Sequence, residues 1–137
     1  LHAKWFDPQL VERLRNAYVQ SQNSPSKEQR DVSAVLRRIQ GAHAVNYVTE
    51  CGLSLDMAHP RSKRGIEVYG RQHYMRNPTT DSWVENGPTR FKSRLLEARG
   101  WTVVRIPFFD WEPLATHDEK VRYLESKLKG EPVENGE

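Results

Sequence analysis

Apolar residues recur three and four positions apart in four segments of this chain, which is the spacing of one face of an α-helix. The segments predicted to be helical are residues 8–20, 27–40, 88–99 and 117–129. Capping-box spacing marks the starts of the second and fourth segments, at Ser26 and Thr116. The third segment places Phe91, Leu95 and Ala98 on one apolar face.

Between these helices the pattern shortens to the period of two that β-strands show. The predicted strands are residues 42–50, 52–58, 65–69 and 101–107. The first three are joined by turns as an antiparallel meander, and the last is apolar on both faces, as in a buried strand. Leu55 and Met57 alternate with Asp56, so we expect Asp56 on the face opposite to them. Residues 71–87 carry no periodic signal, and we interpret them as a long functional loop.

The order of these elements predicts an α/β domain, with a central mixed sheet of about four strands flanked by helices. The helix over 88–99 crosses between the third and fourth strands, so we expect these two strands to be parallel. We assign residues 26–129 to this domain, residues 1–25 to an additional N-terminal helix and linker, and residues 130–137 to an acidic, flexible tail. Because the sequence starts at Leu1 without an initiator Met, we interpret it as part of a longer chain.

Composition and charge exclude some classes of protein and favour another. No apolar run approaches the roughly 18 residues of a membrane-spanning helix, which excludes an integral membrane protein. The single cysteine, Cys51, forms no internal disulfide, which excludes a disulfide-stapled secreted scaffold. Residues 61–105 carry 10 basic and 4 acidic side chains, whereas residues 106–137 carry 4 and 8. The basic segment predicts an anionic partner, of which nucleic acid is the commonest.

Two carboxylates stand on adjacent predicted strands. Asp56 and Glu67 each lie beside apolar residues, so we expect them to converge at one face or one end of the sheet. Paired carboxylates are suited to Mg²⁺, which takes oxygen ligands and activates water at a phosphodiester. His73, where the chain leaves the sheet, is a candidate general base, metal ligand or phosphate contact. Lys92 is a candidate for holding the nucleophilic water or a phosphate group.

Aromatic side chains are interleaved with arginine and lysine in the basic segment, a composition typical of single-stranded RNA recognition. The predicted nucleic-acid-binding residues are Arg64, Tyr69, Arg71, Tyr74, Arg76, Arg90, Lys92 and Arg94. Tyr69, Tyr74 and Trp83 are the candidates for stacking on an unpaired base. The aromatic residues expected in core and turn packing instead are Trp101, Phe108, Phe109 and Trp111. As an alternative to binding roles, Arg64 and Arg71 form ordinary ion pairs with the two carboxylates.

Several spaced motifs connect these candidates to one family of domains. They are Leu55-Asp56, Ile66-Glu67-Val68-Tyr69-Gly70-x-x-His73, Lys92-x-x-Leu95-Leu96, Gly100-Trp101-x-Val103-Val104-x-Ile106-Pro107-Phe108-Phe109-x-Trp111 and Tyr123-Leu124-x-x-Lys127-Leu128. Together these motifs resemble the RAP domain, a family named in part for its presumed RNA binding. The resemblance covers residues 28–129.

The resemblance implies a restriction-endonuclease-like fold, of the PD-(D/E)XK kind that is similar to very-short-patch-repair nucleases. It also implies a C-terminal position behind helical repeats, in a protein that works on RNA in mitochondria or plastids. One position departs from the nuclease motif, because Tyr69 stands where an acidic residue or the activating lysine is expected. This departure weighs against cleavage and leaves Lys92 or His73 to replace the missing lysine.

Three functions are therefore expected, each with its own partner. The first is single-stranded RNA binding in organellar RNA processing, stability or translation, without a cofactor. The second is Mg²⁺-dependent endoribonuclease activity, in which Asp56 and Glu67 hold the metal ion and His73 or Lys92 assists water. The third is a structural module that docks in an organellar ribonucleoprotein or ribosome through the acidic segment 110–137. None of the three involves a membrane.

Overall fold

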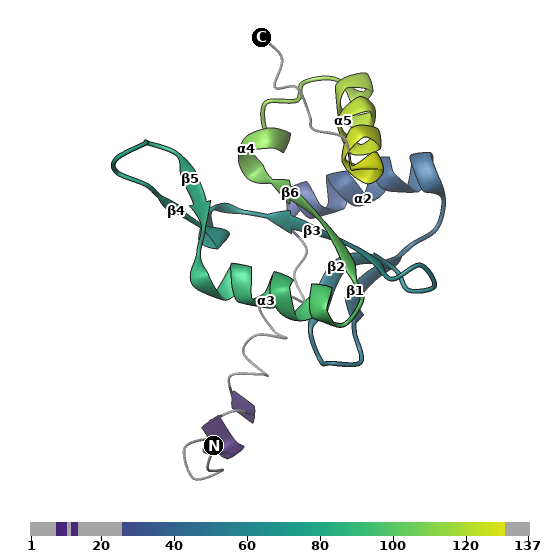
Figure 1. The fold of residues 1–137 in the computed structure, drawn as a ribbon. Coiled ribbons are helices and arrows are strands. Elements are labelled where there is room, and N and C mark those ends of the chain that lie inside the picture. Colours follow the sequence, from purple (N-terminus) through teal and green to yellow (C-terminus); the bar gives the residue numbers. More distant parts are fainter. Residues whose placement is uncertain (1–7, 11, 14–25, 131–137) are drawn as a thin grey trace.

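A four-stranded mixed sheet forms the centre of the protein (Figure 1). The computed structural model describes residues 8–10, 12–13 and 26–130. The sheet has the order β1–β2–β3–β6, with β1 at Ala44–Val48, β2 at Ser54–His59, β3 at Arg64–Tyr69 and β6 at Thr102–Pro107. The first three strands form an antiparallel meander, and β3 and β6 run parallel. The predicted α/β architecture with a mixed sheet is therefore confirmed.

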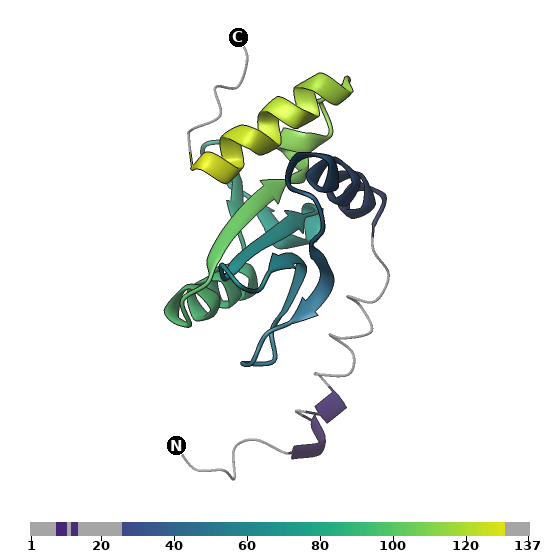
Figure 2. The same cartoon turned by 90° about the vertical axis from the view of Figure 1, so that its right-hand side faces the viewer.

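Helices cover both faces of the sheet (Figures 1 and 2). They are α2 (Lys27–Gln40), α3 (Gly87–Ala98), the short α4 (Phe108–Trp111) and α5 (His117–Lys129). α2 and α5 lie together on one face, and α3 lies on the other. The predicted caps form: the Ser26 hydroxyl accepts from the Gln29 N–H at 3.1 Å, and the Thr116 hydroxyl accepts from the Glu119 N–H at 3.2 Å. Each cap satisfies an N–H group that has no partner inside its helix, which fixes where the helix begins.

Two apolar clusters fill the spaces between the sheet and the helices. The larger cluster, under α2 and α5, comprises the buried residues Val32, Val35, Leu36, Met57, Ile66, Ile106, Trp111, Tyr123, Leu124 and Leu128. The smaller cluster, under α3, comprises Leu55, Ala58, Leu96 and Trp101. Trp101, Phe108 and Trp111 are buried as predicted, whereas Phe109 is 37 % exposed and lies outside the core.

Residues 71–87 hold more structure than the predicted loop. The chain forms a 3₁₀ turn, η2 (Arg71–His73), and then a hairpin of β4 (Tyr74–Arg76) and β5 (Trp83–Glu85). Figure 1 shows this hairpin projecting from the body of the domain beside the start of α3. Strands of three residues are too short to show a periodic pattern, which is why the sequence reads as a loop here. Likewise, the aromatic turn expected after residue 107 is the short helix α4.

The face that α3 buries differs from the apolar face indicated by its spacing. Thr89, Ser93 and Leu96 are buried, whereas Phe91 is 64 % exposed and Leu95 is 38 % exposed. The two buried hydroxyl groups have hydrogen-bond partners beneath the helix, as described below, so burying them costs little. The apolar stripe of α3 consequently faces away from the sheet.

β2 also departs from the predicted alternation around Asp56. Its pairing with β3 ends at Met57 opposite Ile66. Leu55 packs in the smaller cluster and Met57 in the larger one, so these two side chains do not share a face as predicted. The Asp56 carboxylate accepts a hydrogen bond from the Val68 N–H at 2.8 Å, and so satisfies a backbone donor beyond the end of the ladder.

Two of the predicted segments lie at the limits of what the structure describes. The helix expected over 8–20 is largely outside the described residues, although positions 8–10 and 12–13 are helical. The tail expected over 130–137 is outside them except for its first residue. Within the described ranges, no helix is both long enough and apolar enough to cross a membrane.

Candidate functional site

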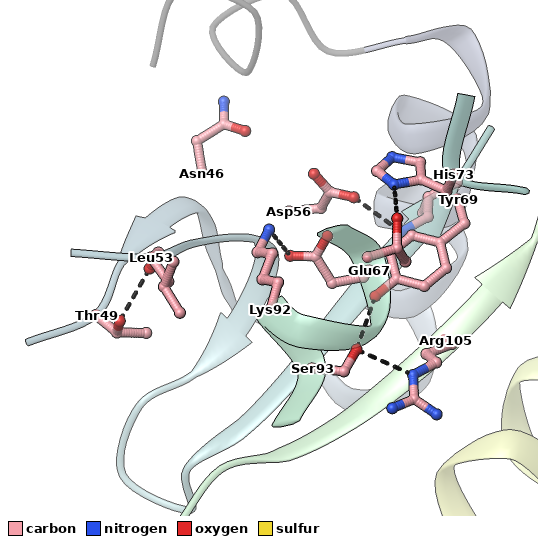
Figure 3. Close-up of polar contacts among 12 residues, drawn as sticks. Asn46, Thr49, Leu53, Asp56, Glu67, Tyr69, His73, Lys92, Ser93 and Arg105 are labelled. Atoms are coloured by element: carbon pink, nitrogen blue, oxygen red, sulfur yellow. Dashed lines mark hydrogen bonds and ion pairs between the residues drawn. The ribbon is translucent and has the colours of Figure 1, made fainter. Parts of the chain in front are cut away.

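A polar pocket of about 430 Å³ opens where β3 ends, between the start of α2 and the turn η2. Its lining residues are Ser26, Glu28, Gln29, Asp56, Glu67, Val68, Tyr69, Gly70, Arg71, Gln72, His73, Phe108 and Glu112. Three of the four predicted catalytic residues, Asp56, Glu67 and His73, therefore lie around one cavity. The fourth, Lys92, reaches Glu67 from α3 (Figure 3). We refer to this cavity below as the polar pocket.

The two carboxylates of the polar pocket are neighbours on paired strands. Asp56 and Glu67 are the next residues of β2 and β3 after the last matched pair of the ladder. Both are buried, with 6 % of Asp56 and 3 % of Glu67 exposed. The expectation that they converge at one place on the sheet is met by this geometry.

Lys92 compensates the charge of this acidic pair. Its Nζ lies 3.1 Å from Glu67 Oε1, and both side chains are largely withdrawn from solvent. The pKa of Glu67 is nevertheless raised to about 7, first by burial and then by repulsion from Asp56, against the attraction of Lys92. Burial also raises the pKa of Asp56, while the Val68 N–H and Lys92 act in the opposite direction. Near neutral pH the Glu67 carboxyl group is therefore only partly ionised, which reduces the negative charge of the acidic pair.

His73 is held at the edge of the polar pocket by α3. Its Nδ1 lies 3.0 Å from the hydroxyl of Thr89, in the first turn of that helix. The pKa of His73 is lowered, first by burial and then by the positive charge of Lys92. The imidazole is therefore uncharged at neutral pH and able to accept a proton.

Tyr69 does not occupy the accessible position that base stacking requires. Its side chain is 1 % exposed, and its ring stacks on His73 with the centroids 4.6 Å apart. Its hydroxyl group lies 3.2 Å from the Ser93 hydroxyl of α3, and Ser93 also accepts from Arg105 Nε at 3.3 Å. Tyr69 thus anchors α3 and His73 to the sheet, and its predicted role as a stacking surface for RNA is corrected on this ground.

Two residues of the site, Thr89 and Ser93, were not identified by the sequence analysis. They are the buried hydroxyl groups of α3, and they orient His73 and Tyr69 respectively. The signal in the sequence is their spacing of i and i+4, which places them on one helix face. The neighbouring stripe that contains Phe91 is more apolar, so the sequence predicted that stripe as the buried face instead.

The predicted cationic residues are divided among several places rather than gathered in one patch. Arg71 lies at the polar pocket, where its two terminal nitrogens pair with Glu112 at 3.3 Å each. Arg76 belongs to the hairpin and pairs with Asp81 at 2.8 Å. The remaining predicted arginines are Arg90 and Arg94, which are exposed on α3, and Arg64, which begins β3 at the end remote from the pocket. Because Glu67 pairs with Lys92 and Arg71 with Glu112, the alternative ion pair between Arg71 and Glu67 is not formed.

The other two stacking candidates are half-buried around one aromatic cluster. The Tyr74 ring lies 5.8 Å from Phe108 and 5.2 Å from Phe109, between centroids. The Trp83 ring lies 5.2 Å from Phe108 and carries the Arg76 guanidinium 4.8 Å above it. Both residues are partly exposed, but each ring already packs against protein.

The donor chemistry of the polar pocket fits Mg²⁺ to a limited degree. Asp56 and Glu67 offer the hard oxygen ligands that Mg²⁺ prefers, and one or two carboxylates suffice where water and phosphate complete the coordination. Across residues 26–130 and the few described before them, no group of three or more His, Cys, Asp or Glu side chains is placed so that its members could hold one metal ion together. Lys92 competes for Glu67, so binding of a cation would require this ion pair to open.

Comparison with known proteins adds an independent line of evidence. Residues 66–127 match the family model of the RAP domain. The chain contains a RAP domain. A RAP domain-containing chloroplastic protein of Oryza sativa subsp. japonica is 33 % identical over 73 residues, which is 53 % of this chain and 11 % of that relative. The chain therefore matches only a small part of the relative's length.

The segment that matches the RAP domain begins within β3, whereas the folded unit begins earlier in the chain. Glu67, Tyr69, His73 and Lys92 lie inside the matched segment, and Asp56 precedes it. β2, which carries Asp56, pairs directly with β3, and α2 packs against β3 through the larger apolar cluster. The polar pocket is thus shared between the matched segment and the elements before it.

Proposed function

We propose that this RAP domain binds single-stranded RNA and acts in RNA processing, stability or translation in a plastid. The observation that carries the proposal is the cationic outer surface of α3, where Arg90 and Arg94 are exposed one helical turn apart. Exposed arginines at this spacing suit successive phosphate groups of a nucleic acid backbone. The similarity to a chloroplastic RAP domain-containing protein supports the plastid location.

The electrostatics beside α3 are compatible with a polyanion. The raised pKa of Glu67 and the ion pair with Lys92 reduce the negative charge that Asp56 and Glu67 present near neutral pH. Arg71 is also exposed at the polar pocket, where its charge balances that of Glu112. A phosphate group that approaches from α3 therefore meets little repulsion.

Reversing two charges on α3, by Arg90→Glu together with Arg94→Glu, is expected to weaken binding of a short single-stranded RNA roughly 10-fold or more at low salt. The dependence of affinity on salt should also become shallower, since about 0.7 is lost from the slope for each phosphate contact removed. Both quantities are measured by fluorescence anisotropy of a labelled RNA over a series of salt concentrations.

The matched control is the double variant Arg37→Glu with Arg38→Glu. It makes the same change in net charge on α2, which lies on the opposite face of the sheet. Affinity close to that of the wild type is expected. Equal weakening by both double variants would mean that only net charge matters, and would contradict a binding surface on α3.

A second candidate function, cleavage of RNA, is favoured by one specific contact. The nuclease motif needs a lysine beside its acidic pair, and Tyr69 stands at the position where the strand would carry it. Lys92 arrives from α3 instead and lies 3.1 Å from Glu67. On the same basis we propose that the fold is restriction-endonuclease-like: the acidic residues lie on the antiparallel pair β2–β3, and α3 crosses to the parallel strand β6.

In this second proposal each residue has a distinct task. Asp56 and Glu67 are the residues that would hold Mg²⁺, and the bound ion would activate water and stabilise negative charge on the phosphodiester. Lys92 holds a scissile phosphate or the attacking water near the acidic pair. His73, uncharged and oriented by Thr89, accepts the proton from that water.

Cleavage of a labelled single-stranded RNA with Mg²⁺ or Mn²⁺ is expected to fall at least 100-fold in Asp56→Asn and in Glu67→Gln, because each change removes a charged oxygen ligand. Glu112→Gln is the control, since it makes the same chemical change in an exposed residue of the polar pocket that pairs with Arg71. Equal cleavage by the wild type and both site variants would indicate a contaminating nuclease and remove this candidate.

A further inference from the structure

An apolar groove of about 450 Å³ borders the polar pocket on the α3 side. The two cavities share Tyr69, Gln72 and His73 in their linings, so they are adjacent. The wall of the groove includes Leu53 before β2 and the exposed stripe of α3, Phe91 and Leu95. We refer to it as the apolar groove.

Phe91 belongs to neither of the two apolar clusters of the core. It is 64 % exposed, which is more than any other large apolar residue in the part of the chain that the structure describes. A phenylalanine contributes to stability by burying its ring, and an accessible ring in a groove is instead available to a ligand. Leu95, one turn along the helix and 38 % exposed, extends the same apolar wall.

The charges around Phe91 indicate what kind of ligand the groove fits. At 100° per residue, the exposed side chains of Arg90 and Arg94 lie along one flank of the Phe91–Leu95 stripe, and Lys92 lies along the other. A nucleotide has this composition, with an apolar base face joined to an anionic phosphate group. An apolar side chain of a partner protein would gain nothing from the exposed cations Arg90 and Arg94 beside the stripe.

We propose that the apolar groove binds one unpaired RNA base, which stacks on the ring of Phe91 while its flanking phosphates meet Arg90 and Arg94. The proposal rests on the RNA binding proposed above and names the place where a base is held. His73 lines both cavities, so a base held in the groove lies next to the polar pocket that contains the acidic pair. Phe91 thus takes the stacking role that the buried Tyr69 does not have.

Phe91→Ala is expected to weaken binding of single-stranded RNA roughly 5- to 100-fold, which corresponds to the loss of one stacked base. The salt dependence should stay as in the wild type, because no phosphate contact is removed. Phe91→Trp should retain or increase the affinity, since indole also offers a π-face. The same variants should leave the thermal unfolding midpoint nearly unchanged, because the side chain is exposed.

An RNA that contains a single 2-aminopurine reports stacking directly, because its fluorescence is quenched when the base lies against an aromatic ring. Quenching on binding is expected with the wild type and Phe91→Trp, and no quenching with Phe91→Ala. If the wild type binds RNA and Phe91→Ala binds with the same affinity and the same quenching, the base site is wrong while RNA binding stands. If the wild type binds no RNA at any salt concentration, the proposed function itself fails and the groove proposal fails with it.

Discussion

Lys92→Met is expected to lower the free energy of unfolding by about 3 kcal/mol at pH 8, and by much less at pH 5. At pH 8 Glu67 is largely ionised in the wild type, because this pH lies above its pKa of about 7, and the variant leaves the buried acidic pair without the cation that compensates it. At pH 5 Glu67 is protonated, because its pKa is raised to about 7, so one of the two charges is absent. Methionine matches the length of the lysine stem, so lost packing contributes little. Urea unfolding at several pH values measures the difference.

The sign of this pH dependence follows from the direction of the pKa shift. A carboxyl group whose pKa is raised on folding contributes most stability below its unfolded pKa, here 4.5, and this contribution is lost as the pH rises through about 7. Removing Lys92 raises the pKa of Glu67 further, so the loss extends to higher pH. The double variant Lys92→Met with Glu67→Gln should recover much of the stability at pH 8, since it removes one of the two uncompensated charges. An equal destabilisation by Lys92→Met at pH 5 and pH 8 would show that the lysine acts through packing alone.

Local signals in the sequence were sufficient for the framework of the fold. The capping residues Ser26 and Thr116 fixed where two helices begin, because each satisfies backbone donors of its own helix. A crossover helix between two strands required β3 and β6 to be parallel, which the register of these strands confirms. The convergence of Asp56 and Glu67 was predictable for the same reason, since both sit on strands that the meander makes neighbours.

The face of α3 was not predictable, because it is decided by partners far away in the sequence. By apolar content alone, Phe91 should face the sheet. Instead, Ser93 faces the sheet because its hydroxyl group lies 3.2 Å from the hydroxyl group of Tyr69, at the end of β3. Thr89 faces the same way because its hydroxyl group lies 3.0 Å from Nδ1 of His73, in η2. A local pattern contains no information about such partners, so the helix was predicted correctly and its orientation was not.

In the candidate site, too, some contacts could be proposed from the sequence and others could not. That Lys92 belongs with Glu67 could be proposed from chemistry, since an acidic pair needs a cation, and the contact of 3.1 Å agrees with it. That Arg71 is instead held by Glu112 depends on where α4 ends, which no periodic signal indicates. The grouping of Lys92 with the acidic pair could therefore be proposed, whereas a pairing between a turn and the end of a distant short helix could not.

Leu36→Ala is expected to lower the free energy of unfolding by about 3 kcal/mol, within the range of 2–5 kcal/mol typical of buried leucines. Leu36 lies on α2, well before the segment that matches the RAP domain, yet its side chain is 0 % exposed and packs with Ile66 and Leu124 of that segment. If α2 belongs to the same folding unit, the whole domain should unfold in one transition at a lower urea concentration. Far-UV circular dichroism and tryptophan fluorescence should then give the same midpoint.

The control for this variant is Leu95→Ala, which makes the same chemical change on a helix where the side chain is 38 % exposed. A change of no more than about 0.5 kcal/mol is expected there. Circular dichroism follows all helices, and the fluorescence includes the buried Trp111, whose Nε1 donates to Asp31 of α2 at 3.1 Å. An early partial loss of both signals in Leu36→Ala, followed by a second transition at higher urea, would mean that α2 unfolds separately. In that case the polar pocket, which begins at Ser26, would depend on a helix that the matched segment does not need for its own stability.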